Sequence, residues 1–181
     1  DVDRIREAVD CGLTELGENK VQEITDKYDI LQRDVKWHMI GHLQTNKVKY
    51  IIDKVKLIHS VDSLRLAEEI NKRAEAAGIV MDILAEINVA EEDSKFGITC
   101  DTAEDTVREM SRLKNIRVRG LMTVAPNVEN GEENRPVFRK LKQLLVDINS
   151  KNIDNVSMDI LSMGMTGDYE TAVEEGSTIV R

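Results

Sequence analysis

The sequence is poor in cysteine and has no long apolar run. Cys11 and Cys100 are the two cysteines among 181 residues, and they lie far apart without metal-ligand spacing. We therefore expect reduced thiols rather than a disulfide framework or a zinc knuckle. No apolar stretch approaches the roughly 20 residues that a membrane helix needs, and no signal peptide opens the chain. These absences predict a cytoplasmic protein without a membrane partner.

Positive charge is also in deficit. The chain has 25 basic and 34 acidic residues, a formal net charge of −9. Because non-specific nucleic-acid binding draws its affinity from neutralised phosphates, we expect no nucleic-acid partner, and any anion site must be local. With 41% hydrophobic residues, the chain is long enough for a sizeable core and short enough for one domain, which we predict over residues 1–181.

Apolar runs rich in β-branched residues alternate with segments of helical period. The runs predict seven strands, over Leu13–Asn19, Lys36–Gly41, Leu57–Val61, Met81–Val89, Val118–Val124, Met158–Gly164 and Ser177–Arg181. The helical segments are Asp3–Cys11, Lys20–Gln32, Asn46–Asp53, Ser63–Ala77, Thr102–Leu113, Glu133–Ser150 and Asp168–Glu175. Ala125–Glu132, rich in Asn, Glu and Gly, is predicted to be a long loop.

This alternation predicts parallel strands joined by crossovers, in a single α/β (β/α)₈ barrel of the TIM type. An open, doubly wound sheet of six or seven strands is the competing architecture. The chain begins on a helix, so closing eight strands requires another strand before Asp3. It lacks an initiator Met and stops at Arg181, at the end of its last predicted strand. We expect that both ends are truncated relative to the natural protein.

A candidate phosphate site lies where the strand Met158–Gly164 passes into Gly164, Thr166 and Gly167 and then into the acidic start of a helix. Free N–H groups at a helix N-terminus attract anions, and glycines let the backbone come close. The alternative is a strand, a turn and a Thr166 helix cap with no ligand. Function in a barrel lies at the carboxyl ends of the strands, and the last strands often hold phosphate. Arg181 would end the adjacent strand.

The histidines give no strong sign of a metal site. His38 and His42 have the spacing of a helical metal pair, but Trp37, Met39 and Ile40 around them favour a strand, on which they would lie about 13 Å apart. His59, within an apolar strand, is interpreted as a core or rim histidine. There is no Gly-x-Ser-x-Gly elbow and no Walker loop. The sequence therefore predicts a binding site more readily than a catalytic set.

Several separated motifs resemble one family along essentially the whole chain. They are Gly17-Glu-Asn-Lys-Val-Gln-Glu23, Trp37-His-Met-Ile-Gly-His-Leu-Gln-Thr-Asn-Lys47, Arg119-Gly-Leu-Met122, Leu161-Ser-Met-Gly-Met-Thr166 and Gly176-Ser-Thr-Ile-Val-Arg181. The chain is similar to the pyridoxal-phosphate homeostasis proteins, formerly called proline synthase co-transcribed proteins and related to the N-terminal barrel of alanine racemase. The resemblance implies a barrel that binds pyridoxal 5′-phosphate, has no established catalytic reaction and serves vitamin B6 and amino-acid or keto-acid homeostasis.

The same resemblance assigns expected binding residues. Ser162, Gly164, Met165 and Thr166 match the segment that seats the phosphate, where the family usually has Ser in place of Thr166. Arg181 matches the arginine near the pyridine nitrogen. Two further positions are Asn19, which matches a residue lining the cofactor pocket, and Lys47, which is equally well read as a solvated lysine of a first helical turn.

Two departures from the family pattern lie at the ends. The lysine expected to form the Schiff base would precede Asp1 and is absent, as is the Gly-Thr segment expected after Arg181. Two other functions stay open: a pyridoxal-phosphate-dependent amino-acid racemase, and a phosphosugar-binding barrel enzyme. The related racemases use a second domain and a partner's tyrosine, which this chain does not show. A monomer or a weak homodimer is expected.

Overall fold

The computed structural model describes residues 2–31, 35–91 and 96–181, and strands and helices alternate along them. The strands are β1 (Glu15–Glu18), β2 (Lys36–Met39), β3 (Val55–Val61), β4 (Met81–Asn88), β5 (Ile98–Thr99), β6 (Ile116–Met122) and β7 (Val156–Ser162). The α-helices are α1 (Val2–Asp10), α2 (Val21–Leu31), α3 (Leu64–Ala77), α4 (Ala103–Met110), α5 (Arg135–Ser150) and α6 (Tyr169–Glu174). Three short 3₁₀ helices are η1 (Thr45–Tyr50), η2 (Cys100–Thr102) and η3 (Gly131–Asn134).

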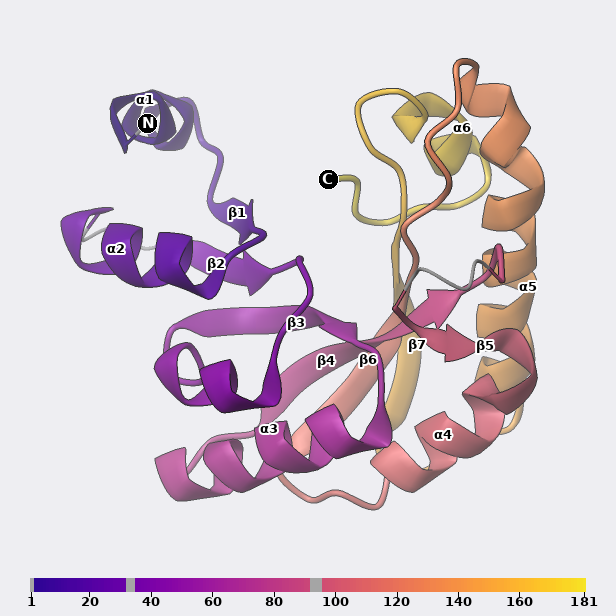
Figure 1. Ribbon diagram of the computed structural model, residues 1–181, viewed down its shortest axis with the longest axis horizontal. Coiled ribbons are helices and arrows are strands. Elements are labelled where there is room, and N and C mark those ends of the chain that lie inside the picture. Colours follow the sequence, from indigo (N-terminus) through magenta and orange to yellow (C-terminus); the bar gives the residue numbers. More distant parts are fainter. Residues whose placement is uncertain (1, 32–34, 92–95) are drawn as a thin grey trace.

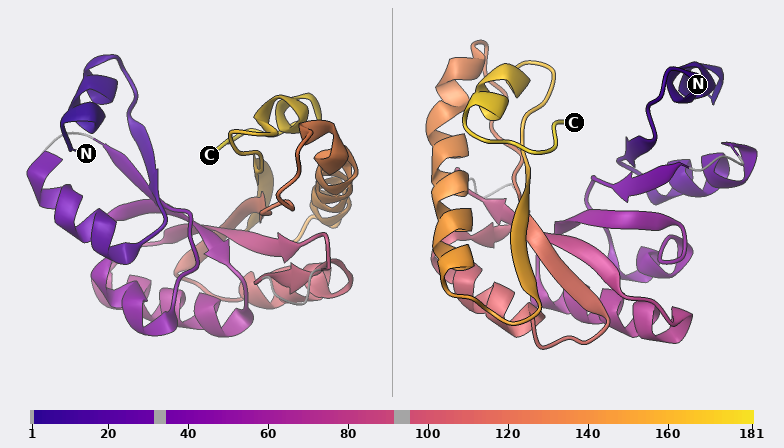
Figure 2. Two further views of the ribbon diagram at one scale, coloured as in Figure 1. Left: turned by 45° about the horizontal axis from the view of Figure 1, so that its top comes forward. Right: turned by 180° about the vertical axis from the view of Figure 1, so that it is seen from behind.

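The strands form one parallel sheet in the order β1-β2-β3-β4-β6-β7, and β5 pairs with the end of β4. The sheet is strongly curved, with α3, α4 and α5 on its outer side (Figure 1). Among the described residues β1 pairs only with β2, and the C-terminal segment lies across the opening from β1 (Figure 2). The predicted parallel barrel wall is confirmed, and it is open between these two edges.

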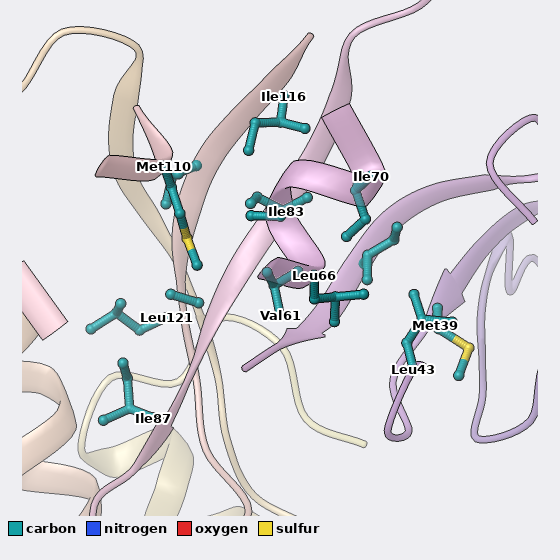
Figure 3. Packing of buried hydrophobic residues seen from close by; sticks show 14 of the residues in the cluster. Met39, Leu43, Val61, Leu66, Ile70, Ile83, Ile87, Met110, Ile116 and Leu121 are labelled. Atoms are coloured by element: carbon teal, nitrogen blue, oxygen red, sulfur yellow. The ribbon is translucent and has the colours of Figure 1, made fainter. Parts of the chain in front are cut away.

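Helix α3 shows how local sequence sets the outer layer. Ser63 caps its first turn by accepting the N–H of Leu66, and Gly78 ends it at φ +67°, a conformation that suits glycine. Leu66 and Ile70, one turn apart, are fully buried and lie against the sheet beside Val61 (Figure 3). Burying each such side chain stabilises the fold by about 1.5–3 kcal/mol. The main core therefore lies between the sheet and the outer helices.

A second, smaller apolar cluster lies on the other face of the sheet. Leu57, Leu84 and Met122 come from β3, β4 and β6, and Ile160 and Ile179 pack against them. Strands with apolar neighbours on both faces read as continuous apolar runs, because neither face is solvated. This cluster forms the floor below the carboxyl ends of the strands.

Three secondary-structure predictions need correction. Ser177–Arg181 is not a strand: main-chain bonds join Ile179 to Leu161 and Met163 in a single parallel bridge, and the N–H of Leu161 bonds the Thr178 hydroxyl in place of a main-chain carbonyl. The segment predicted as a helix over Asn46–Asp53 is the 3₁₀ helix η1 followed by a turn. The two-residue strand β5 was not predicted. In the described part of the chain, no helix has both the length and the apolarity to cross a membrane.

Candidate functional site: the cavity at the carboxyl ends of the strands

A cavity of about 380 Å³ lies where the carboxyl ends of the parallel strands converge. Asn19 follows β1, Glu86 lies near the end of β4, Val124 follows β6, and Met165 follows β7. Arg181, from the C-terminal segment, completes this set. The volume is in the range of small-molecule sites, and the position is the one that barrel folds use for ligands. We call this space the mouth cavity.

The structure brings some of the sequence-predicted site residues together and separates others. Asn19, Met165 and Arg181 line the mouth cavity. Thr166 is exposed and lines a neighbouring hollow of about 360 Å³ formed with η3 and α6. Ser162 is fully buried beneath the cavity, and Gly164 is buried at φ +96°. A ligand that touched both Arg181 and Thr166 would bridge two hollows.

The start of α6 is less free than the sequence suggests. Asp168 precedes the helix, and its carboxylate accepts the main-chain N–H of Met165 at 2.7 Å and the side-chain amide of Asn134 at 2.8 Å. Tyr169 donates its N–H to the carbonyl of Met165. We expected the N–H groups at this turn to lack partners, and this is wrong for the N–H groups of Met165 and Tyr169. Thr166 also does not cap the helix, because the N-cap position belongs to Asp168.

Arg181 is anchored by a chain of buried polar side chains. Its Nη1 donates to Ser162 Oγ at 2.7 Å, and its Nη2 donates to the carbonyl of Thr123 at 2.9 Å. Ser162 Oγ lies 2.9 Å from His59 Nδ1, and His59 Nε2 lies 3.0 Å from His38 Nδ1. The four side chains, from β2, β3, β7 and the C-terminal segment, form what we call the interior relay. It holds the guanidinium at one place on the cavity wall.

The charge states of the interior relay limit how its side chains can donate and accept hydrogen bonds. Burial lowers the pKa of His59 to about 3, helped by the nearby His38 and Arg181, and burial also lowers the pKa of His38. Both imidazoles are therefore neutral near pH 7. Arg181 can only donate, so Ser162 Oγ accepts from it. A neutral His59 has one donor and one acceptor nitrogen, so it takes opposite roles toward Ser162 and His38.

Glu86 is the cavity residue that sequence reasoning missed. It is 8% exposed, and its Oε2 is buried with no hydrogen-bond partner among the described residues. Burial raises its pKa to about 7, and the charge of Asp62 adds to the rise while Arg181 opposes it. The available signal was a carboxyl inside an apolar strand run, two residues after the inward-facing Leu84.

His42 lines the mouth cavity, and Lys47 lies in a neighbouring hollow. The His42 ring stacks on Phe96 with centroids 3.7 Å apart, and its Nδ1 is 3.3 Å from Asp62. Lys47, in the first turn of η1, lines a neighbouring hollow with Asn19, and its ammonium lies 5.6 Å from the centre of the Tyr50 ring. His42 thus contacts Phe96 and Asp62, whereas His38 contacts His59. Within the described ranges no group of His, Cys, Asp or Glu is arranged to hold a metal ion.

The arrangement suits a small ligand with an anionic part. The wall of the mouth cavity carries one anchored cation, an amide at Asn19 and one buried carboxyl, beside apolar groups such as Ile87 and Val124. Few polar groups in a mostly apolar hollow are typical of sites that orient a small molecule.

Comparison with known proteins supports this picture. The family described as "Alanine racemase, N-terminal domain" matches residues 2–181. The "Pyridoxal phosphate homeostasis protein" of Aquifex aeolicus is 49% identical over 178 residues, which cover 98% of this chain and 77% of that protein. PipY of Synechococcus elongatus superposes without pyridoxal phosphate at a TM-score of 0.93, with 31% identity. With pyridoxal phosphate bound, PipY superposes at 0.90 with 30% identity, and both comparisons cover 99% of this chain and 84% of PipY. The chain therefore belongs to the pyridoxal phosphate homeostasis protein family, within the wider family of alanine racemase N-terminal domains.

Proposed function

We propose that this protein binds pyridoxal 5′-phosphate in the mouth cavity and serves vitamin B6 and amino-acid or keto-acid homeostasis without catalysing an amino-acid reaction. The observation that carries the proposal is the anchored Arg181 in a cavity of suitable size, in a chain whose fold matches PipY with pyridoxal phosphate bound. Asn19 and Met165 would contact the ring, and Gly164, Thr166 and the buried Ser162 would form or support the phosphate seat. Lys47 is a candidate for the outer edge.

Arg181 favours a carrier over a broad amino-acid enzyme. When bound, pyridoxal phosphate supplies an electron-withdrawing ring, and that property is strongest when its ring nitrogen is protonated. A fixed guanidinium beside the nitrogen disfavours that protonation by like-charge repulsion. The interior relay holds the guanidinium in place through two bonds to Ser162 and one to Thr123. The chain's own residues would therefore bind the ring and restrain its reactivity.

The setting that we propose is a single barrel domain over residues 1–181, in the cytoplasm, as a monomer or weak homodimer. Cys11 and Cys100 are both free thiols, which fits a reducing compartment. The net charge of −9 disfavours a nucleic-acid partner.

The first test is spectroscopic and kinetic, on the full natural chain. Titration with pyridoxal phosphate is expected to give a saturable visible absorbance band. Assays of Cα deuterium exchange and loss of optical rotation with alanine and serine are expected to show no enzymatic turnover. Turnover of about 1 to 1,000 per second would favour a racemase. A protein that stays colourless and binds no pyridoxal phosphate would favour a phosphosugar-binding barrel.

Thr166→Val tests the phosphate seat within the same titration. The change keeps the shape of the side chain and deletes one hydrogen bond to a charged group. Such a loss is about 1.5–3 kcal/mol, or about 10- to 150-fold in affinity. Thr14→Val, an equal change at an exposed residue just before β1, is the matched control and should bind like wild type. Equal affinities for wild type and Thr166→Val would remove Thr166 from the site.

A further inference from the structure

Glu86 presents an unsatisfied carboxyl at the wall of the mouth cavity. More than nine-tenths of the residue is buried, and among the described residues Oε2 has no hydrogen-bond partner. Leaving a buried polar atom unpaired is costly, and such atoms in native proteins call for a specific explanation, such as a bound ligand or water. Rotation of the carboxyl exchanges its two equivalent oxygens, so either can face the cavity.

Two charged residues shift the pKa of Glu86 in opposite directions. Asp62, after β3, repels an ionised Glu86, but Asp62 itself lies 3.3 Å from His42 Nδ1. Arg181 attracts it from the C-terminal segment, although both terminal guanidinium nitrogens already donate to Ser162 and Thr123. On the inner face of β3, His59 is neutral for the reason given above.

Met122 and Asp82, on β6 and β4, do not add to these two effects on the pKa of Glu86. Met122, the partner of Glu86 in the β4–β6 register, is apolar. On β4 itself, Asp82 lies at the opposite end of the strand, where it pairs with Arg117 and Arg119. With burial added, the pKa of Glu86 stands at about 7, so the protonated and ionised forms coexist near neutral pH.

We propose that Glu86 is a ligand-binding residue that is protonated in the complex and donates a hydrogen bond to an acceptor oxygen of pyridoxal phosphate. This inference rests on the proposed function. It adds Glu86 as a residue that contacts the ligand and the uptake of one proton by Glu86 on binding. An ionised carboxylate would repel the anionic ligand strongly in a water-poor cavity. One proton taken from solvent removes that repulsion and turns Oε2 from an unpaired acceptor into a donor. Ligand binding and proton uptake are then coupled.

The test measures binding of pyridoxal phosphate to the full natural chain from pH 6 to 8.5, with calorimetry in two buffers of different ionisation enthalpy. The competent, protonated fraction of Glu86 falls above pH 7, so the dissociation constant of wild type should rise about 30-fold by pH 8.5. Glu86→Gln donates from its amide at every pH, and its affinity should lack this rise. Glu86→Leu cannot donate and should bind about tenfold more weakly than Glu86→Gln at pH 6.

The ligand's own titration is common to all three proteins, so differences between them report Glu86. Uptake of one more proton by wild type than by Glu86→Gln at pH 8 supports the proposal. Parallel pH profiles with equal proton uptake would overturn the role of Glu86 while leaving pyridoxal phosphate binding intact. Failure of wild type to bind the ligand at every pH would instead overturn the proposed function, and this inference with it.

Discussion

At the scale of single residues, buried hydroxyls and carboxyls in this barrel differ in whether they have partners. Ser162 and Ser60 are both fully buried, but Ser162 Oγ contacts Arg181 and His59, whereas Ser60 Oγ has no partner among the described residues. An unpaired hydroxyl contributes nothing to stability, and a paired one holds its neighbours in place. The two serines are therefore a natural pair for comparison.

Ser162→Ala should destabilise the protein by about 1.5–3 kcal/mol, because a hydrogen bond to a charged group is lost and Arg181 loses its anchor. Ser60→Ala makes the same change at equal burial and should be neutral or slightly stabilising. Urea unfolding of the full natural chain measures both. The proposed contact of Arg181 with the ring predicts in addition a shifted absorbance maximum of bound pyridoxal phosphate for Ser162→Ala alone. Equal unfolding free energies for the two variants would contradict the interior relay.

Glu86 is expected to lower the stability of the free protein. Its pKa is about 7 when folded against an ordinary value of 4.5, so its favourable contribution is complete below pH 4.5 and is lost as the pH rises to 7. Glu86→Gln removes this loss and should raise the free energy of unfolding by about 2–3 kcal/mol at pH 8, with little change at pH 4. Urea unfolding without ligand at both pH values checks this. A gain of equal size at both would point to packing rather than ionisation.

At the scale of elements, the turn from β7 into α6 is closely packed at one of its two glycines. Gly164 has φ +96°, and an added Cβ would lie 2.6 Å from Ala172 Cβ and 3.1 Å from Tyr169 Cα. Gly167, three residues on, has nothing within 4 Å of an added Cβ. Both glycines were predicted to let a ligand approach the backbone. At Gly164 the lack of a side chain also allows the close packing of α6 against the end of β7.

Gly164→Ala should therefore cost about 2–4 kcal/mol through backbone strain and the clash with α6. Gly167→Ala, in the same turn, should stay within about 0.5 kcal/mol of wild type. Thermal unfolding of both variants compares them, and their affinities for pyridoxal phosphate show whether displacing α6 disturbs the mouth cavity. A large stability loss for Gly167→Ala would show that the turn is constrained in a way the structure does not reveal.

The secondary structure could be predicted where a hydrophobic pattern runs along a segment. It could not be predicted where a single tertiary contact determines whether a segment pairs as a strand. Met81–Val89 and Leu57–Val61 are mostly apolar runs whose residues are nearly all buried, so they identify β4 and β3 directly. Ser177–Arg181 has the composition of a strand, but the Thr178 hydroxyl takes the N–H of Leu161 and the pairing stops at one bridge. β5 has two residues and no periodicity to detect.

The candidate site shows the same division. The position of Met165 and Asn19 follows from the rule that the carboxyl ends of parallel strands meet, whereas Arg181 reaches the cavity from a segment that is not a strand. The separation of Thr166 into a second hollow depends on Asp168 turning back to Met165, a contact that no spacing encodes. The unpaired state of Glu86 likewise depends on side chains from three strands.

At the scale of the whole molecule, the barrel has an apolar shell outside the sheet and a polar relay within it. The outer core supplies most of the stability, since it contains most of the buried apolar side chains. The inner side adds His38, His59 and Ser162, all buried and neutral at pH 7. Neutral imidazoles inside a fold make its stability depend on pH on the acid side.

His59 sets the size of that dependence. Its pKa is 6.5 in the reference state and about 3 in the fold, so below pH 6.5 the unfolded chain binds a proton that the folded chain does not. The contribution is complete above pH 6.5 and declines by about 1.4 kcal/mol for each pH unit on the way to pH 3.

His59→Gln keeps a hydrogen-bonding side chain and removes this titration. It should be less stable than wild type at pH 7, because the Ser162 and His38 contacts are imperfectly replaced, and the difference should shrink by more than 2 kcal/mol between pH 6.5 and pH 4.5. Urea unfolding at half-unit pH steps measures the two curves, and the carboxylates common to both proteins cancel in the difference. Curves that stay parallel would mean that His59 is already protonated in the fold. His59 would then donate from both ring nitrogens, to Ser162 and to His38, and its positive charge would weaken the hold on Arg181.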